Sequence, residues 1–138
     1  MPDLVELAKE IATAAHEGQE DKAGMPYICH PQFVADHVES ADEKIVAYLH
    51  DVLEDTPVTE EHLAQWFPAH IIEAVNALTR RENECYFDFI GRVKLNPLAR
   101  SVKQADLQHN MMLERIPEPT EKDYLRLDKY REAYCRLA

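Results

Sequence analysis

Glycine is scarce in this chain of 138 residues, and its scarcity limits the folds that the chain can adopt. Only three glycines occur, at positions 18, 24 and 91, whereas alanine, leucine and glutamate are abundant. Tight β-hairpins need glycine or asparagine where φ is positive, while alanine, leucine and glutamate are strong helix formers. No segment alternates apolar and polar residues with the period of two that marks a half-buried strand. The sequence therefore predicts an all-α fold.

Apolar residues recur at intervals of three and four along most of the chain, which is the spacing of one helix face. The first such repeat covers residues 4–15, and the following stretch, 18–27, contains Gly24 and Pro26 and reads as a loop. Further helices are predicted at 31–38, 42–53 with Asp42 as its cap, 59–67, 69–78, 84–95, 97–115 and 120–137. We expect about seven or eight helices that form a single domain over residues 1–138.

The charge of the chain excludes some partners. Fifteen Lys and Arg face 26 Asp and Glu, a net charge of −11, which would repel a nucleic acid polymer. A small phosphate ester remains compatible, because a bound divalent cation reverses the local field. Apolar runs are far shorter than the roughly 20 residues of a membrane span, and the first residues begin no signal peptide. We therefore expect a cytoplasmic protein without a membrane partner. A homo-oligomer is compatible with these features.

Four ionisable residues lie close together in the third predicted helix: His50, Asp51, Glu54 and Asp55. A spacing of four residues places His50 above Glu54 and Asp51 above Asp55 on one face. Apolar neighbours surround them, so the carboxylates should be partly desolvated, and a divalent cation would offset that cost. A solvated helix face or a hydrogen-bonded core histidine is the alternative interpretation.

Two residues elsewhere in the chain could complete a metal site. His30 stands immediately before Pro31 at a predicted helix start, and Asp106 interrupts the apolar pattern of the helix at 97–115. Two histidines and two aspartates form a mixed nitrogen and oxygen ligand set, which suits Mn, Fe or Zn better than Mg or Ca. We expect one divalent ion, with Mn²⁺ as first choice and Fe²⁺, Zn²⁺ and Mg²⁺ as alternatives.

Four motifs follow one another along the chain. They read HEGQ from His16, PYICHP from Pro26, HDVLEDT from His50 and VKQADLQHN from Val102. In this order they resemble the HD-domain phosphohydrolases. Within that family they are most similar to the hydrolase domain of bifunctional alarmone synthetase/hydrolases and to small stand-alone relatives. The resemblance runs from about His16 to about Leu113 and implies a helical HD-domain fold.

The resemblance implies a role for each matching residue. The metal ligands of the family fall on His30, His50, Asp51 and Asp106. Glu54 and Asp55 match the pair that orients or activates the attacking water. Lys22, Tyr27 and Asn110 match positions on the substrate side, and Asn110 corresponds to a contact with the nucleotide sugar.

The activity implied by the resemblance is metal-dependent hydrolysis of a nucleotide phosphate or pyrophosphate ester. Its specific form would be a guanosine 3′,5′-bis(diphosphate) 3′-pyrophosphohydrolase. The alternative is a catalytically weak regulatory module that binds a nucleotide or a metal.

Some positions differ from the alarmone hydrolase pattern. Asp21 stands where those enzymes usually carry Arg, and Leu107 and Met112 stand where they tend to carry cations. Each lost charge-assisted hydrogen bond to phosphate costs about 1.5–3 kcal/mol, enough to change the preference among phosphate esters. The residues that could restore positive charge are Arg80, Arg81, Arg100, Lys103 and Arg115.

Two further histidines accompany these motifs. His16 ends the first predicted helix, where an imidazolium interacts favourably with the helix dipole, so we expect it to be structural. His109 lies within a turn of Asp106. It could orient a ligand, or it could be a buried imidazole whose hydrogen bonds are satisfied.

Overall fold

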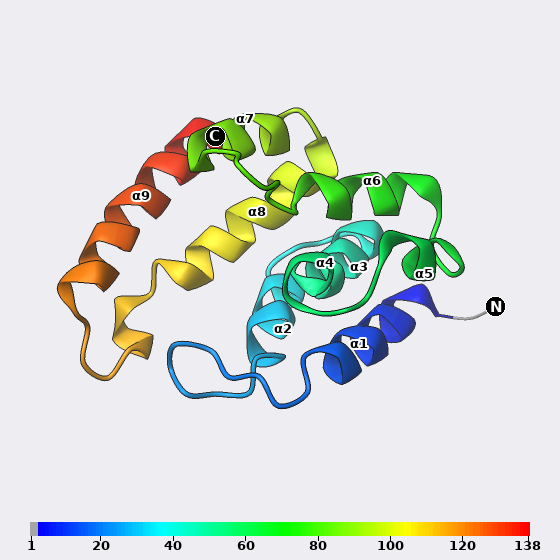
Figure 1. The fold of residues 1–138 in the computed structure, drawn as a ribbon, viewed down its shortest axis with the longest axis horizontal. Coiled ribbons are helices and arrows are strands. Elements are labelled where there is room, and N and C mark those ends of the chain that lie inside the picture. The colour runs from blue at the N-terminus through cyan, green and yellow to red at the C-terminus, as the bar shows by residue number, and fades with distance from the viewer. Residues whose placement is uncertain (1–2) are drawn as a thin grey trace.

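A computed structural model describes residues 3–138 of the chain. Within them, nine α-helices and one 3₁₀ turn make up the fold, and no strand is formed (Figure 1). The helices are α1 (Leu4–Ala15), α2 (Cys29–Asp36), α3 (Ala41–Leu49), α4 (Val52–Asp55), α5 (Glu60–Ala64), α6 (Ala69–Ala77), α7 (Tyr86–Lys94), α8 (Pro97–Asn110) and α9 (Glu121–Leu137). The 3₁₀ turn η1 (Leu113–Arg115) follows α8. The predicted all-α class is confirmed.

The helix starts follow local capping chemistry. The Asp3 side chain accepts hydrogen bonds from the backbone N–H groups of the first turn of α1. Asn96 caps α8, which has proline in its first turn. The prediction of Asp42 as the cap of the third helix is wrong. Ser40 takes that place, because its backbone is extended and its side chain forms a reciprocal capping box with Glu43.

The predicted helix at 42–53 is in fact two helices, α3 and α4, separated at His50 and Asp51. In a continuous helix the N–H of Asp51 would donate to the carbonyl of Ala47. Here the His50 ring Nδ1 donates to that carbonyl at 2.6 Å, and the Asp51 backbone has φ −104° and ψ 0°. A side chain that competes for a backbone carbonyl in this way favours the end of a helix. The prediction of one continuous helix over 42–53 is therefore wrong.

Two other boundaries differ from the prediction. α2 starts at Cys29 rather than at Pro31, so His30 lies inside its first turn. α8 ends at Asn110, and the chain continues through η1 rather than as helix to Arg115.

α8 crosses the middle of the molecule, with α2 and α3 on one side and α7 and α9 on the other (Figure 1). α3 also packs against α1. The apolar core includes the fully buried Val46, Leu49, Val102 and Leu107 from the two central helices, α3 and α8. Charged and polar groups are buried where α2, α3 and α8 meet, and this junction holds the candidate site. No helix within residues 3–138 is both long enough and apolar enough to cross a bilayer.

Candidate metal centre

Three predicted metal ligands meet at the junction of α2, α3 and α8. His30 comes from the first turn of α2, His50 from the break between α3 and α4, and Asp106 from the third turn of α8. Their ligand atoms all lie within 4.8 Å of one another, and no residue of the three is more than 4% exposed. Two imidazoles and a carboxylate that converge in a buried place can hold a divalent cation.

His50 is prepared to act as a metal ligand. Its Nδ1 donates to the carbonyl of Ala47, which leaves Nε2 as the nitrogen that faces the cluster. Nε2 is buried and lies 3.0 Å from Asp51 Oδ2 and 3.4 Å from Asp106 Oδ1, and it makes no hydrogen bond within residues 3–138. Burial lowers the pKa of His50, but these two carboxylates outweigh it and raise the pKa well above its usual value. The surroundings of Nε2 therefore favour a positive charge, which a bound cation would supply.

His30 is held through both ring nitrogens. Nε2 lies 2.7 Å from Asp106 Oδ1, and Nδ1 lies 2.7 Å from Nδ1 of His109. His109 stacks on Phe33 at 4.1 Å between ring centres. Burial, together with Arg115, lowers the pKa of His109 to about 4, so this ring is neutral at pH 7 and can accept from His30. His109 thus orients a candidate ligand, which was one of the two roles that its sequence position allowed.

Asp51 lies beside the cluster rather than among its closest members. Its Oδ2 is 3.9 Å from His30 Nε2 and accepts a hydrogen bond from the Tyr27 hydroxyl at 2.5 Å. Burial and the charge of Asp51 raise the pKa of Tyr27, so the phenol keeps its proton and continues to donate. Asp51 as the fourth ligand stays a prediction.

Asp106 is neutralised from the side away from the histidines. Its Oδ2 accepts from Lys103 Nζ at 2.7 Å, and Asn110 donates its amide to Oδ1 at 3.1 Å. Burial opposes the ionised form, but Lys103 and the two histidines hold the pKa of Asp106 well below its usual value. Lys103 was predicted from the sequence only as a possible source of positive charge, although its spacing of three residues from Asp106 on one helix could have revealed this pair.

Glu54 and Asp55 lie on α4 beside this centre, and both are exposed. Partial burial and the nearby charge of Asp51 raise the pKa of each carboxyl above its ordinary value. Raised carboxyl pKa values are typical of groups that take up a proton in catalysis.

A link from α1 holds the end of α4. His16 is 2% exposed, and its Nδ1 pairs with Gln19 Oε1 at 2.9 Å. Gln19 in turn donates its amide to the backbone carbonyl of Asp55 at 3.1 Å. The HEGQ motif therefore supports α4 from outside the site, which gives His16 a specific structural contact that its sequence position did not reveal.

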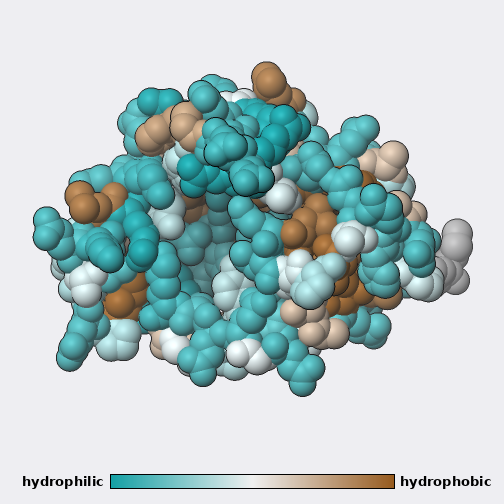
Figure 2. Space-filling view, viewed as in Figure 1, coloured by the Kyte–Doolittle hydropathy of each residue, from teal (hydrophilic) through white to brown (hydrophobic). Residues whose placement is uncertain are grey.

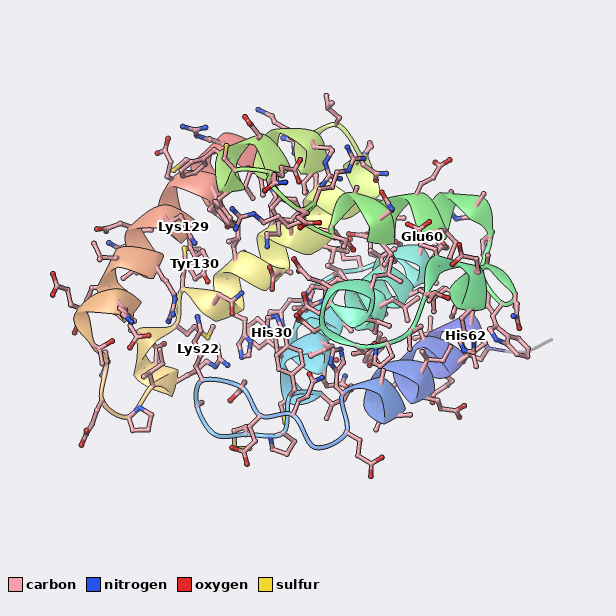
Figure 3. All side chains as sticks on the ribbon, viewed as in Figure 1. Lys22, His30, Glu60, His62, Lys129 and Tyr130 are labelled. Carbon is pink, nitrogen blue, oxygen red and sulfur yellow. The ribbon has the colours of Figure 1, made fainter. Side chains whose placement is uncertain are left out.

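A cavity of about 290 Å³ opens next to the metal centre. Predicted substrate residues Lys22, Tyr27 and Asn110 line it together with His30, Asp51 and Asp106. Figure 3 shows Lys22 near His30, with Tyr130 of α9 across from them. The recess in the face shown in Figure 2 is lined mainly by hydrophilic residues, as suits a polar ligand.

The spare cations predicted from the sequence have different positions. Arg115 lines the cavity, but its guanidinium pairs with Asp21 at 3.1 Å and donates to the His109 carbonyl. Arg100 donates to the carbonyl of Leu137, away from the site. Arg81 is exposed and does not line this cavity.

Known proteins resemble the chain in sequence. A family model described as HD domain matches residues 8–115. A guanosine-3′,5′-bis(diphosphate) 3′-pyrophosphohydrolase of Haemophilus influenzae is 34% identical over 93% of the chain and 21% of its own length. A probable GTP pyrophosphokinase of Mycobacterium leprae is 33% identical over 84% of the chain and 16% of its own length. The chain thus spans a small part of these longer relatives.

A solved structure resembles the fold. It is a metazoan orthologue of SpoT, described as hydrolysing ppGpp and playing a role in starvation responses. The match has a TM-score of 0.79 and covers 99% of this chain and 86% of that one, with 18% identity. At that identity the likeness shows the fold alone.

Proposed function

Because the chain belongs to the HD domain family, we propose that it is a metal-dependent phosphohydrolase that removes the 3′-pyrophosphate of guanosine 3′,5′-bis(diphosphate) in the cytoplasm. The relative from Haemophilus influenzae bears the name of this activity. The observation that carries the proposal is the buried set of His30, His50 and Asp106 at the edge of a polar cavity. We also propose that residues 1–138 form a single domain of this kind.

His30, His50 and Asp106 would hold one divalent ion, with Asp51 as the fourth ligand and Mn²⁺ as first choice. The fit rests on the buried Nε2 of His50, which has no hydrogen-bond partner among the described residues and faces two carboxylates. When bound, such a cation lowers the pKa of water and polarises a phosphoryl oxygen.

The remaining steps belong to side chains of this chain. Glu54 accepts the proton of the attacking water, and its raised pKa suits that task. Asp55 orients the water from the same helix. Lys22 and Asn110 bind the nucleotide in the larger cavity, which both of them line. Attack of the water oxygen on the phosphorus of the ester breaks the bond to the 3′-oxygen, which takes up a proton, and releases pyrophosphate and GDP.

The test is turnover of purified protein loaded with Mn²⁺ against a panel of nucleotides, with pyrophosphate and orthophosphate measured separately. We expect pyrophosphate release from guanosine 3′,5′-bis(diphosphate). Glu54→Gln should keep the metal and lose about 10²–10⁴-fold in kcat, the usual contribution of a general base. Normal turnover by Glu54→Gln would refute the role of Glu54, and turnover of none of the nucleotides would refute the proposed activity.

The second candidate is a regulatory module that binds a nucleotide or a metal with little catalysis. It is favoured by the ion pair between Asp21 and Arg115, because an Arg115 guanidinium that binds Asp21 is not available to bind phosphate. Nucleotide binding in the same panel without turnover would support it.

A further inference from the structure

A second, smaller cavity of about 220 Å³ borders the metal centre between α8, α9 and the start of α7. Its lining includes His50, Asp51 and Glu54 from the metal centre. It also includes the cations Arg80, Lys103 and Lys129. Three cations around one small cavity are unexpected in a chain of net charge −11. Figure 3 shows Lys129 beside Tyr130 on α9, and Tyr130 lines both cavities.

Two of these cations have no acidic partner. Among residues 3–138, neither Arg80 nor Lys129 has a carboxylate within 4.0 Å. The Arg80 guanidinium donates its Nε to the carbonyl of Glu84, and its terminal nitrogens make no hydrogen bond to the described residues. Burial and the charge of Arg80 lower the pKa of Lys129. The two cations therefore repel each other, and an anion between them would relieve that repulsion.

A buried donor belongs to a ring that both cations approach. The Tyr86 ring is 4.5 Å from Lys129 Nζ and 5.8 Å from the Arg80 guanidinium carbon, measured to the ring centre. Its hydroxyl is buried and makes no hydrogen bond within residues 3–138. An unsatisfied buried hydroxyl costs about 1–3 kcal/mol, so a ligand oxygen that accepts from it gains that amount.

We propose that this smaller cavity binds a diphosphate group, held by Arg80, Lys129 and the Tyr86 hydroxyl. The cavity adjoins Glu54 and His50, where the proposed reaction breaks the ester, so the group it holds is the pyrophosphate that leaves. The nucleoside then lies in the larger cavity, on the side of Lys22. This inference rests on the proposed function for its place in the reaction, but pyrophosphate binding can be measured without turnover.

Asp51 and Glu54 border the same cavity and would repel a free anion. The test therefore uses the full chain loaded with Mn²⁺, titrated calorimetrically with sodium pyrophosphate and, separately, with orthophosphate. Arg80→Met and Lys129→Met should each weaken pyrophosphate binding about tenfold, the value of one charge-assisted hydrogen bond. Tyr86→Phe should weaken it by a smaller factor. Lys122→Met is the matched control, because Lys122 is an exposed lysine on the same helix outside the cavity.

The affinity for Mn²⁺, followed by electron paramagnetic resonance, distinguishes loss of the anion site from loss of the fold. We expect it to stay within twofold of the parent in Arg80→Met, Lys129→Met and Tyr86→Phe. Pyrophosphate binding that is unchanged in all three would overturn the inference, as would orthophosphate binding as tightly as pyrophosphate. If pyrophosphate binds with this dependence but guanosine 3′,5′-bis(diphosphate) is not cleaved, the proposed function fails and the diphosphate site stands.

Discussion

At the scale of single residues, the candidate metal centre depends on which nitrogen of each histidine faces the cluster. His50 leaves Nε2 free because Nδ1 is engaged by the carbonyl of Ala47. His30 is oriented by His109, whose low pKa keeps its ring neutral at pH 7, so that it can accept a hydrogen bond from His30. Such outer partners fix the tautomer and the angle of a ligand ring.

Asp106→Ala should abolish tight metal binding. The change removes the carboxylate that His30 and His50 share, and it leaves Lys103 as a buried cation without a partner. We expect no stoichiometric Mn²⁺ in the purified variant by elemental analysis. Stoichiometric Mn²⁺ in a folded Asp106→Ala protein would show that the ion lies elsewhere.

His109→Phe tests the outer partner. The aromatic ring that stacks on Phe33 is kept, and the hydrogen bond to His30 is lost. Loss of such a partner typically weakens metal affinity by about 10–100-fold, and we expect a change of that size in Mn²⁺ titrations. His70→Phe on the exposed surface should leave the affinity unchanged. Equal affinities in the two variants would contradict the orienting role.

At the scale of elements, α8 carries Asp106 on one side and core residues on the other. Leu107 is fully buried directly after Asp106. Leu107→Ala should lower the free energy of unfolding by about 2–5 kcal/mol, measured by urea denaturation. Leu95→Ala, at a residue that is 84% exposed, should change it by less than about 0.5 kcal/mol. A small effect of Leu107→Ala would mean that α8 is not anchored through this side chain.

The start of α7 is held by Glu84 and Arg92. Arg92 forms two hydrogen bonds with Glu84, at 2.8 and 3.0 Å, and also donates to the carbonyls of Ala77 and Thr79. The hydrogen bonds from Arg92, and then the backbone N–H of Arg81, lower the pKa of Glu84 from 4.5 to about 2.

Because the pKa of Glu84 is lower in the folded state, its contribution to stability is present above pH 4.5 and is lost as the pH falls toward 2. Glu84→Gln should therefore have a lower free energy of unfolding than the parent at pH 7. The difference should shrink below pH 4.5 and disappear near pH 2. A difference that is independent of pH would show that the charge of Glu84 is not its cause.

At the scale of the whole molecule, one ion pair joins segments that are 94 residues apart. Asp21 of the loop after α1 binds Arg115 of η1 at 3.1 Å, with side-chain exposures of 8% and 21%. Both residues line the larger cavity. The negative charge of Asp21 is therefore neutralised by a cation from another segment.

A double-mutant cycle with Asp21→Asn and Arg115→Met should give a coupling energy of about 0.5–3 kcal/mol in unfolding experiments, as for residues in direct contact. Exposed pairs are worth at most about 1 kcal/mol, so a value above that would reflect partial burial. Additive effects of the two changes would show that the pair does not hold the loop in solution.

The sequence was sufficient for the all-α class and for the types of the site residues. Scarce glycine and the spacing of apolar residues predicted the all-α class, because both depend on local backbone preferences. The kinds of ligand, imidazole and carboxylate, are also read directly from residues such as His50 and Asp106.

Only the tertiary structure decided how these residues face one another. The role of Arg115 depends on Asp21, a partner that packing brings close from 94 residues away. His30 and Asp106, 76 residues apart, likewise meet only in the folded chain. The second cavity combines Arg80 from before α7 with Lys129 from α9. Local spacing determines which face of a helix a side chain occupies. What lies opposite that face is determined by the burial of all the helices around one core.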